Sequence, residues 1–248
     1  MHYTEKHQFG PIESLQMGVG YFGVPPVTVH SFFIDGLLID TGPPKLEKEL
    51  LQWLENKALE QVFITHHHED HSGNVNPISS QFDVPIYGSL GCSELVQGKV
   101  GTSLPQKLFW GTPVFTDRVM AYDRTTLSTA KYNFELIPIP GHAIDQVALF
   151  EPNQGWLFSA DAFVSPQIKY FMKKESMAQQ IESLKKMVAL DFDLLLWTVR
   201  RITPYLSNLM PTPAMPRKRW PDVVSWPAPP LACHFPGAMR SNADAVSR

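Results

Sequence analysis

The sequence has little of several features that would assign it to a class of protein. It contains only two cysteines, Cys92 and Cys233, and they lie too far apart in the sequence to suggest a disulfide framework. No apolar run of about 18 residues occurs, so we expect no membrane-spanning helix. The first residues contain no apolar core of a signal peptide, and we therefore expect a cytoplasmic protein with no membrane partner.

An excess of charge of one sign is also lacking. The chain of 248 residues carries 21 Lys and Arg against 24 Asp and Glu, a formal net charge of −3. Such a balance gives no argument for binding nucleic acid. Hydrophobic residues make up 44% and charged residues 18%, which is typical of a globular chain that is long enough to bury a large core.

One short segment is rich in side chains that bind metals. Four histidines and two acids fill the six positions from His66 to His71. Neutral imidazole and carboxylate are the usual ligands of zinc and related divalent metals. Residues 60–64 predict a short buried strand before this segment, and Ser72-Gly73-Asn74 predict a turn after it. The segment should therefore lie on a loop at the carboxyl end of a strand, where open α/β folds bind their ligands.

The spacing within this segment narrows the kind of site. His66 and His68 are two residues apart, which points both side chains the same way in an extended backbone. They are not four apart on a helix, so this is not the HExxH motif of zinc proteases. Asp70 and His71 follow at once and suit a second, adjacent metal position. The alternative is a solvated, tag-like histidine run, but a tag would lie at a terminus, without acids and without a strand before it.

The run His66-x-His68-x-Asp70-His71 after a strand resembles the HxHxDH signature of the metallo-β-lactamase superfamily. Three more segments resemble elements of that family in the expected order, and they are Leu38-Ile39-Asp40-Thr41-Gly42, Pro140-Gly141-His142 and Ser159-Ala160-Asp161. The resemblance covers about residues 20–196. It implies an α/β fold, the four-layer αβ/βα metallo-β-lactamase sandwich.

The resemblance also implies a site with two metal positions. The implied ligands are His66, His68 and His142 for the first ion and Asp70, His71 and Asp161 for the second, with Asp161 bridging. Zinc is the expected metal, as one or two ions, although iron or manganese would suit the same ligands. Asp70 is also the expected catalytic residue, because it could orient the attacking water and accept a proton. Asp40 is expected to orient the histidine loop without being a ligand.

Strands and helices are expected to alternate, which predicts parallel βαβ units. The expected strands cover residues 27–34, 37–39, 62–64, 84–88, 134–140, 147–150, 156–163 and 191–197. The expected helices cover residues 45–57, 71–80 and 175–190. Asp35-Gly36 predicts a hairpin turn, and Pro85 predicts a free edge on its strand.

Several side chains allow two interpretations. Phe109 and Trp110, in the irregular residues 98–130, either contact a substrate pocket or simply pack. Asp145 either supports a histidine ligand or faces solvent. In the helix expected at 175–190, five apolar residues follow helical spacing and predict a buried face, and they are Met177, Ile181, Leu184, Met187 and Val188.

The pattern changes abruptly after residue 196, and we divide the chain there into a metallo-β-lactamase-like domain, 1–196, and an irregular or disordered tail, 197–248. The tail holds nine of the 22 prolines and has a net charge of +5, which leaves −8 for residues 1–196. The family's last histidine ligand is missing after Trp197, and no histidine follows until His234. We therefore expect a sandwich that is incomplete at its carboxyl end. A shift of the reading frame near codon 197 would explain the change.

These observations predict a metal-dependent hydrolase that uses an activated water on a small ester, thioester or lactone. The alternative is a degenerate metal-binding protein with little or no catalysis, because one ligand is missing. A nuclease of the same family would need a basic surface to bind nucleic acid, but residues 1–196 carry a net charge of −8. An oxygen-reducing di-iron protein would have Glu in place of His68 and an added flavin domain.

Overall fold

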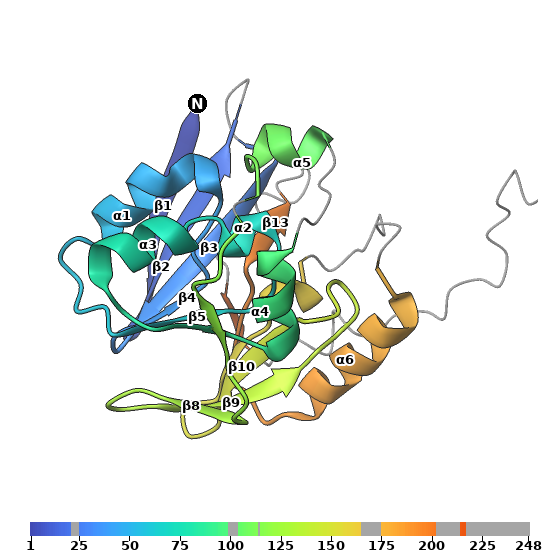
Figure 1. The fold of residues 1–248 in the computed structure, drawn as a ribbon. Helices are drawn as coiled ribbons and strands as arrows, with labels where there is room; N and C mark the ends of the chain where they lie inside the picture. The colour runs from blue at the N-terminus through green and yellow to red at the C-terminus, as the bar shows by residue number, and fades with distance from the viewer. Residues whose placement is uncertain (21–24, 99–103, 114, 165–174, 202–213, 217–248) are drawn as a thin grey trace, which may run out of the picture.

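The fold is built from two β-sheets that face each other, with helices on both outer sides (Figure 1). The computed structural model describes residues 1–20, 25–98, 104–113, 115–164, 175–201 and 214–216. In Figure 1, α1 and α3 cover the outside of one sheet, and α6 lies on the far side of the other.

The first sheet has eight strands in the order β1-β2-β3-β4-β5-β6-β7, with β13 paired to β3. The strands are β1 (His2–Phe9), β2 (Ile12–Val19), β3 (Val27–Ile34), β4 (Leu37–Ile39), β5 (Gln61–Ile64), β6 (Ile86–Gly88), β7 (Val119–Ala121) and β13 (Val199–Arg201). Strands β1 to β4 pair antiparallel and β4 to β7 pair parallel. The parallel pairs put the ends of β4 and β5 side by side, and the segment from His66 to His71 follows β5.

The second sheet has six strands in the order β14-β12-β11-β10-β9-β8. The strands are β8 (Thr126–Ser128), β9 (Asn133–Pro138), β10 (Val147–Glu151), β11 (Trp156–Phe158), β12 (Leu194–Leu196) and β14 (Ala214–Pro216). All neighbours are antiparallel except β11 and β12. The loops that carry His142 and Asp161 leave this sheet after β9 and β11.

The helices join or cover these strands. They are η1 (Pro44–Leu46), α1 (Glu47–Leu54), α2 (Glu69–Ser72), α3 (Val75–Phe82), α4 (Leu90–Gln97), α5 (Leu104–Phe109), η2 (Ala160–Ala162) and α6 (Met177–Ala189). Among the described residues, no helix is both long enough and apolar enough to cross a membrane.

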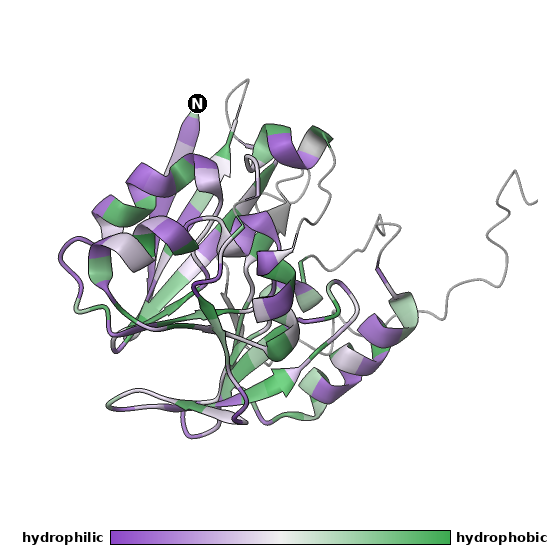
Figure 2. Cartoon of the chain, in the orientation of Figure 1, coloured by the Kyte–Doolittle hydropathy of each residue, from purple (hydrophilic) through white to green (hydrophobic). Residues whose placement is uncertain are grey.

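Three apolar clusters separate four layers. Along β4 and β5, alternate side chains enter different clusters: Leu38 and Val62 pack toward α1 and α3, whereas Ile39 and Phe63 pack between the sheets. A third cluster, which includes Met187, lies between the second sheet and α6. Figure 2 shows the central strands mostly hydrophobic and the helices of mixed character. Because side chains on both faces of a central strand enter apolar clusters, these strands are apolar along their whole length. The predicted four-layer sandwich is confirmed.

The strands expected at 27–34 and 37–39 are confirmed to the residue, and a hairpin turn joins them. Asp35 and Gly36 have φ angles of 46° and 80°, the left-handed values that this turn type requires. Strands β1 and β2, by contrast, were not expected. Strand β1 is the polar outer strand of its sheet, so it shows no clean alternation of apolar and polar residues.

Two expectations are corrected, and one open alternative is decided. Strand β6 is not an edge, because it pairs with both β5 and β7, and Pro85 lies just before it with its carbonyl accepting from Val62 N. Trp110 is buried in the core beside α1, and Phe109 packs against it, so both are packing residues. On α6, Met177 and Ile181 are 55% and 42% exposed, whereas Met187 of the same expected face is buried.

The division of the chain at residue 196 stays a prediction. Residues 199–201 and 214–216 add strands β13 and β14 to the two sheets. Most of the tail, including His234, lies outside the described residues, and the reading-frame hypothesis falls on that part of the chain.

Candidate metal centre

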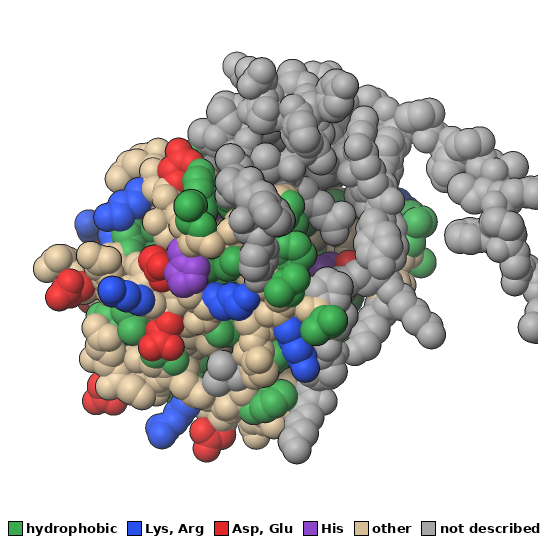
Figure 3. Space-filling model, turned by 90° about the horizontal axis from the view of Figure 1, so that it is seen from above, with side chains coloured by type: hydrophobic (Ala, Val, Ile, Leu, Met, Phe, Trp, Pro, Cys, Tyr) green, Lys and Arg blue, Asp and Glu red, His purple; other side chains and the backbone are tan. Residues whose placement is uncertain are grey.

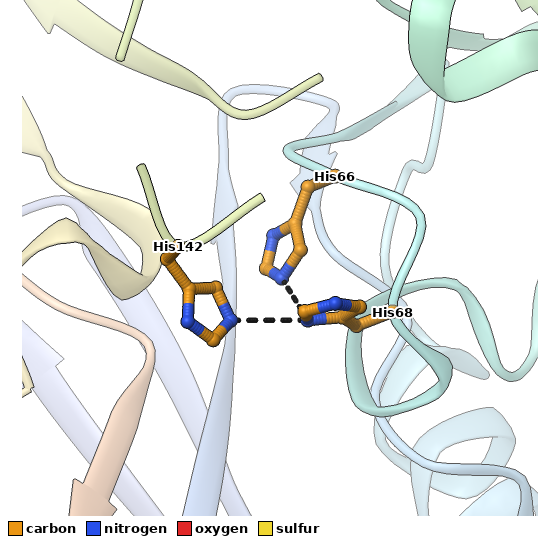
Figure 4. A group of neighbouring side chains, drawn as sticks. All are labelled: His66, His68 and His142. Atoms are coloured by element: carbon orange, nitrogen blue, oxygen red, sulfur yellow. Dashed lines mark hydrogen bonds between the residues drawn. The ribbon is translucent and has the colours of Figure 1, made fainter. Parts of the chain in front are cut away.

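Three histidines from two loops converge at the carboxyl ends of the strands. His66 and His68 follow β5, and His142 follows β9 across the interface between the sheets (Figure 4). His68 Nδ1 lies 3.0 Å from His66 Nε2 and 3.0 Å from His142 Nε2. One ligand atom from each ring can be chosen so that all lie within 4.8 Å of one another. A single Nδ1 cannot satisfy both neighbouring nitrogens with one proton, and this fits a shared cation better than a hydrogen-bonded chain.

A second group of side chains lies beside the first. His71 Nε2 is 3.4 Å from Asp161 Oδ1 and 3.6 Å from Asp70 Oδ2. The other oxygen of Asp161, Oδ2, is 3.4 Å from His142 Nε2, so this carboxylate lies between the two groups. His71 Nε2 and Asp161 Oδ1 are buried and have no hydrogen-bond partner among the described residues. Buried polar atoms of this kind call for a partner such as an ion.

Asp40 holds the histidine loop in place through Thr65 and His71. Its carboxylate accepts hydrogen bonds from Thr65 N at 2.8 Å and Thr65 Oγ1 at 2.9 Å, and it contacts His71 Nδ1 at 2.8 Å. Asp40 has a φ of 62°, a left-handed conformation that Asp tolerates better than most residues. These contacts agree with the supporting role expected of Asp40, because they leave His71 Nε2 facing the acids.

Asp145 ties the two loops together. Its carboxylate accepts from His67 N at 2.8 Å and contacts His67 Nδ1 at 2.8 Å, so it faces neither solvent nor a member of the three-histidine group. His67 itself belongs to neither candidate metal group. The histidines of this run therefore have different roles: His67 anchors the loop, while His66 and His68 point into the centre.

Burial and neighbouring charges shift the pKa values in opposite directions. Burial, with added repulsion from His71, lowers the pKa of His66 well below its usual value. Burial alone would also lower the pKa of His71, but the carboxylates of Asp161 and Asp70 outweigh it and raise that pKa well above the usual value. Burial would raise the pKa of Asp161, yet the attraction of His71 lowers it. These shifts favour the neutral form of His66 and the ionised form of Asp161, whereas the acids beside His71 favour its protonated form.

Two further residues at the centre were not expected from the sequence. Glu175 contacts His142 Nδ1 at 2.6 Å, and it lies just before α6, where a lone acid gives no signal. Thr198 is buried next to Asp161, whose pKa it helps to lower, and its backbone N donates to Ala160 O.

Two facing mixed sheets with outer helices, and a His-Asp cluster at the strand ends, define an α/β sandwich with a centre suited to metal. The chain belongs to the metallo-beta-lactamase superfamily, whose sequence pattern matches residues 24–198. That match ends next to the point at which the composition of the chain changes.

Relatives of known name lie at low sequence identity. A hydroxyacylglutathione hydrolase of Nitrosomonas eutropha is 25% identical over 175 residues, which are 70% of this chain and 58% of that protein. A hydroxyacylglutathione hydrolase of Bdellovibrio bacteriovorus is 29% identical over 103 residues, 42% of this chain and 34% of that protein. The chain thus spans only about a third to three fifths of the length of these relatives.

The fold also resembles solved structures. A metallo-beta-lactamase from Pontibacter korlensis superposes with a TM-score of 0.62 at 20% identity, covering 79% of this chain and 91% of that one. This likeness shows the fold.

Proposed function

We propose that the protein is a metal-dependent hydrolase that acts on a small ester, thioester or lactone. The observation that carries the proposal is the convergence of His66, His68 and His142 from two sheets, with a second acidic group beside them. Membership of the family supports it.

The residues present fit a divalent cation. The three-histidine group offers imidazole nitrogens only, and the second group adds the carboxylates of Asp70 and Asp161 to His71. Zinc accepts both kinds of ligand and is our first choice, while iron or manganese would be held by the same atoms.

When bound, a divalent cation lowers the pKa of water and polarises a carbonyl oxygen. The protein supplies the remaining steps. Asp70 is buried at the centre and lies next to His71, where its carboxylate can orient the attacking water and take up a proton. Asp145 and Asp40 keep the loop in place without entering the reaction.

The second metal position is the weaker one. His66 is a member of both candidate groups, yet its Nε2 can bind only one ion. When it completes the three-histidine group, His71 and Asp161 remain for the second ion, with the Asp70 carboxylate 3.6 Å from His71 Nε2. We therefore expect two ions to bind with unequal affinity.

A thioester is the first substrate class to test. The relatives reported above are named for cleaving an acyl group from glutathione, to which acyl groups are joined through sulfur. On the face seen in Figure 3, the Lys and Arg side chains of the described residues lie singly among Asp and Glu, with no continuous basic stripe. The described part of this face therefore gives no argument for nucleic acid as the partner.

A second candidate is a metal-binding protein that no longer turns over a substrate. Thr198 favours it, because this residue stands after β12, where the family pattern has its last histidine ligand. A threonine hydroxyl is a poor ligand for zinc compared with imidazole.

Metal content and turnover together test the two candidates. Protein purified without chelator is analysed for metal, then assayed on chromogenic thioesters, esters and lactones after loading with zinc, iron or manganese. The hydrolase predicts turnover that falls at least about a hundredfold in Asp70→Asn, because general base and orienting residues contribute about that much. Stoichiometric metal with no turnover under any loading would reject the hydrolase and favour the second candidate.

A further inference from the structure

Whereas its second half buries Met187 in the apolar core, the first half of α6 turns polar side chains inward. Gln180 and Ser183 are buried there, and both donate to backbone carbonyls: Gln180 Nε2 to Ala162 O at 2.6 Å and Ser183 Oγ to Pro140 O at 2.6 Å. Pro140 precedes the loop of His142, and Ala162 follows Asp161. One helix thus binds the two loops that bring the second sheet's side chains to the centre.

The contact between α6 and the His142 loop is close. Ser176 N donates to Gly141 O at 2.8 Å. Gly141 has a φ of 148°, and a Cβ built on it would lie 2.5 Å from Gln180 Oε1 and 2.6 Å from the Gln180 backbone. The loop can adopt this position only with glycine at residue 141, so the start of α6 and the loop form one packed unit.

Glu175, just before this helix, reaches the histidine ring itself. Its Oε1 lies 2.6 Å from His142 Nδ1, and both side chains are largely buried. The same ring presents Nε2 to His68, as Figure 4 shows. We infer that Glu175 is a positioning residue for His142. Its carboxylate accepts a hydrogen bond from Nδ1–H of the ring, so the lone pair of Nε2 is left for a cation. The inference rests on the metal centre of the proposed function.

His142 needs such a partner more than the other two histidines of its group. His66 and His68 share one short loop, which Asp40 and Asp145 fix by several hydrogen bonds. His142 comes from the other sheet. A hydrogen bond between carboxylate and imidazole is of the strong, charge-assisted kind and fixes both the ring orientation and the tautomer.

Zinc affinity is the direct test. We would titrate the full chain with Zn²⁺ against a chromophoric chelator and compare wild type with Glu175→Ala, Glu175→Gln and Glu175→Asp. Loss of a hydrogen-bond partner of a histidine ligand weakens metal binding by about 10–100-fold, which is the loss expected for Glu175→Ala. Asp keeps the charge and Gln keeps an acceptor, so each should recover part of that loss. Glu182→Gln is the matched control for Glu175→Gln. It removes the same charge from α6, at a side chain that is 66% exposed.

A second readout separates positioning from a general loss of structure. The Nδ1 proton of His142, bonded to a carboxylate, should give a downfield proton resonance in the zinc-loaded wild type that disappears in Glu175→Ala. Circular dichroism of each variant in EDTA checks that the fold is retained. Unchanged zinc affinity in Glu175→Ala, or an equal loss in Glu182→Gln, would overturn the inference.

These outcomes are independent of turnover. A protein that hydrolyses nothing but loses zinc affinity in Glu175→Ala would reject the proposed hydrolase and keep the positioning role. A protein that hydrolyses a substrate, and whose zinc affinity is unchanged in Glu175→Ala, would keep the proposed hydrolase and reject the positioning role.

Discussion

Replacing Asp40 by Asn should uncouple the histidine loop from the sheet beneath it. One carboxylate oxygen of Asp40 faces Thr65 N, and the other faces both Thr65 Oγ1 and His71 Nδ1. An amide places a donor in one of these two positions. If the NH₂ group faces His71, the ring must accept at Nδ1 and carry its proton on Nε2, which then has no lone pair for a cation.

The size of the effect follows from burial. Asp40 and His71 are fully buried, and an unmatched buried polar group costs about 1–3 kcal/mol, more when a charge is involved. We expect a loss of about 3 kcal/mol, which lowers the melting temperature by about 6–12 °C in a domain of this size. Asn tolerates the left-handed φ of residue 40, so the backbone contributes little to the loss.

Thermal denaturation followed by circular dichroism measures this loss, first in EDTA and then in zinc. Asp117→Asn is the matched control, because the Asp117 side chain is 87% exposed. Elemental analysis should show less than the wild-type zinc content in Asp40→Asn. The reasoning is refuted if Asp40→Asn has the melting temperature of the Asp117→Asn control and keeps the wild-type zinc content.

Three further outcomes are expected. Gly141→Ala should lower both the melting temperature and the zinc affinity, because its Cβ would clash with Gln180, whereas Gly98→Ala, with no contact closer than 3.7 Å, should change neither. Zinc at about one hundred times its dissociation constant should stabilise the fold by about 2.7 kcal/mol, an increment that disappears with EDTA in a denaturant titration. Burial and the nearby Asp145 raise the pKa of the Cys92 thiol, so in a Cys233→Ser variant iodoacetamide should label Cys92 only after unfolding, as peptide mass spectrometry would show.

Local patterns predicted the parts of the fold that depend on neighbours in the sequence. Strands β3 and β4 read correctly because both are strongly apolar and the turn between them requires left-handed residues. The run from His66 to His71 was recognisable for the same reason, since its ligand types and their spacing lie within one loop.

Other parts depend on partners that sequence spacing does not reveal. The apolar spacing of α6 predicted the burial of Met187 correctly but that of Met177 and Ile181 wrongly. Near its start the helix meets backbone carbonyls of two loops, which accept hydrogen bonds from Gln180 and Ser183. Glu175 was missed since its partner, His142, lies 33 residues away in the sequence. Likewise, strand β1 pairs with β2 at the outer side of its sheet and carries no apolar period of its own.

The donor atoms of the centre belong to both sheets, which has a consequence for the order in which the protein assembles. His66 and His71 leave the first sheet, and His142 and Asp161 leave the second. An unfolded chain therefore offers only the 66–71 run, and the complete centre exists only after the two halves have docked. A bound ion would join these halves as a cross-link does, so slow release of zinc should accompany separation of the sheets.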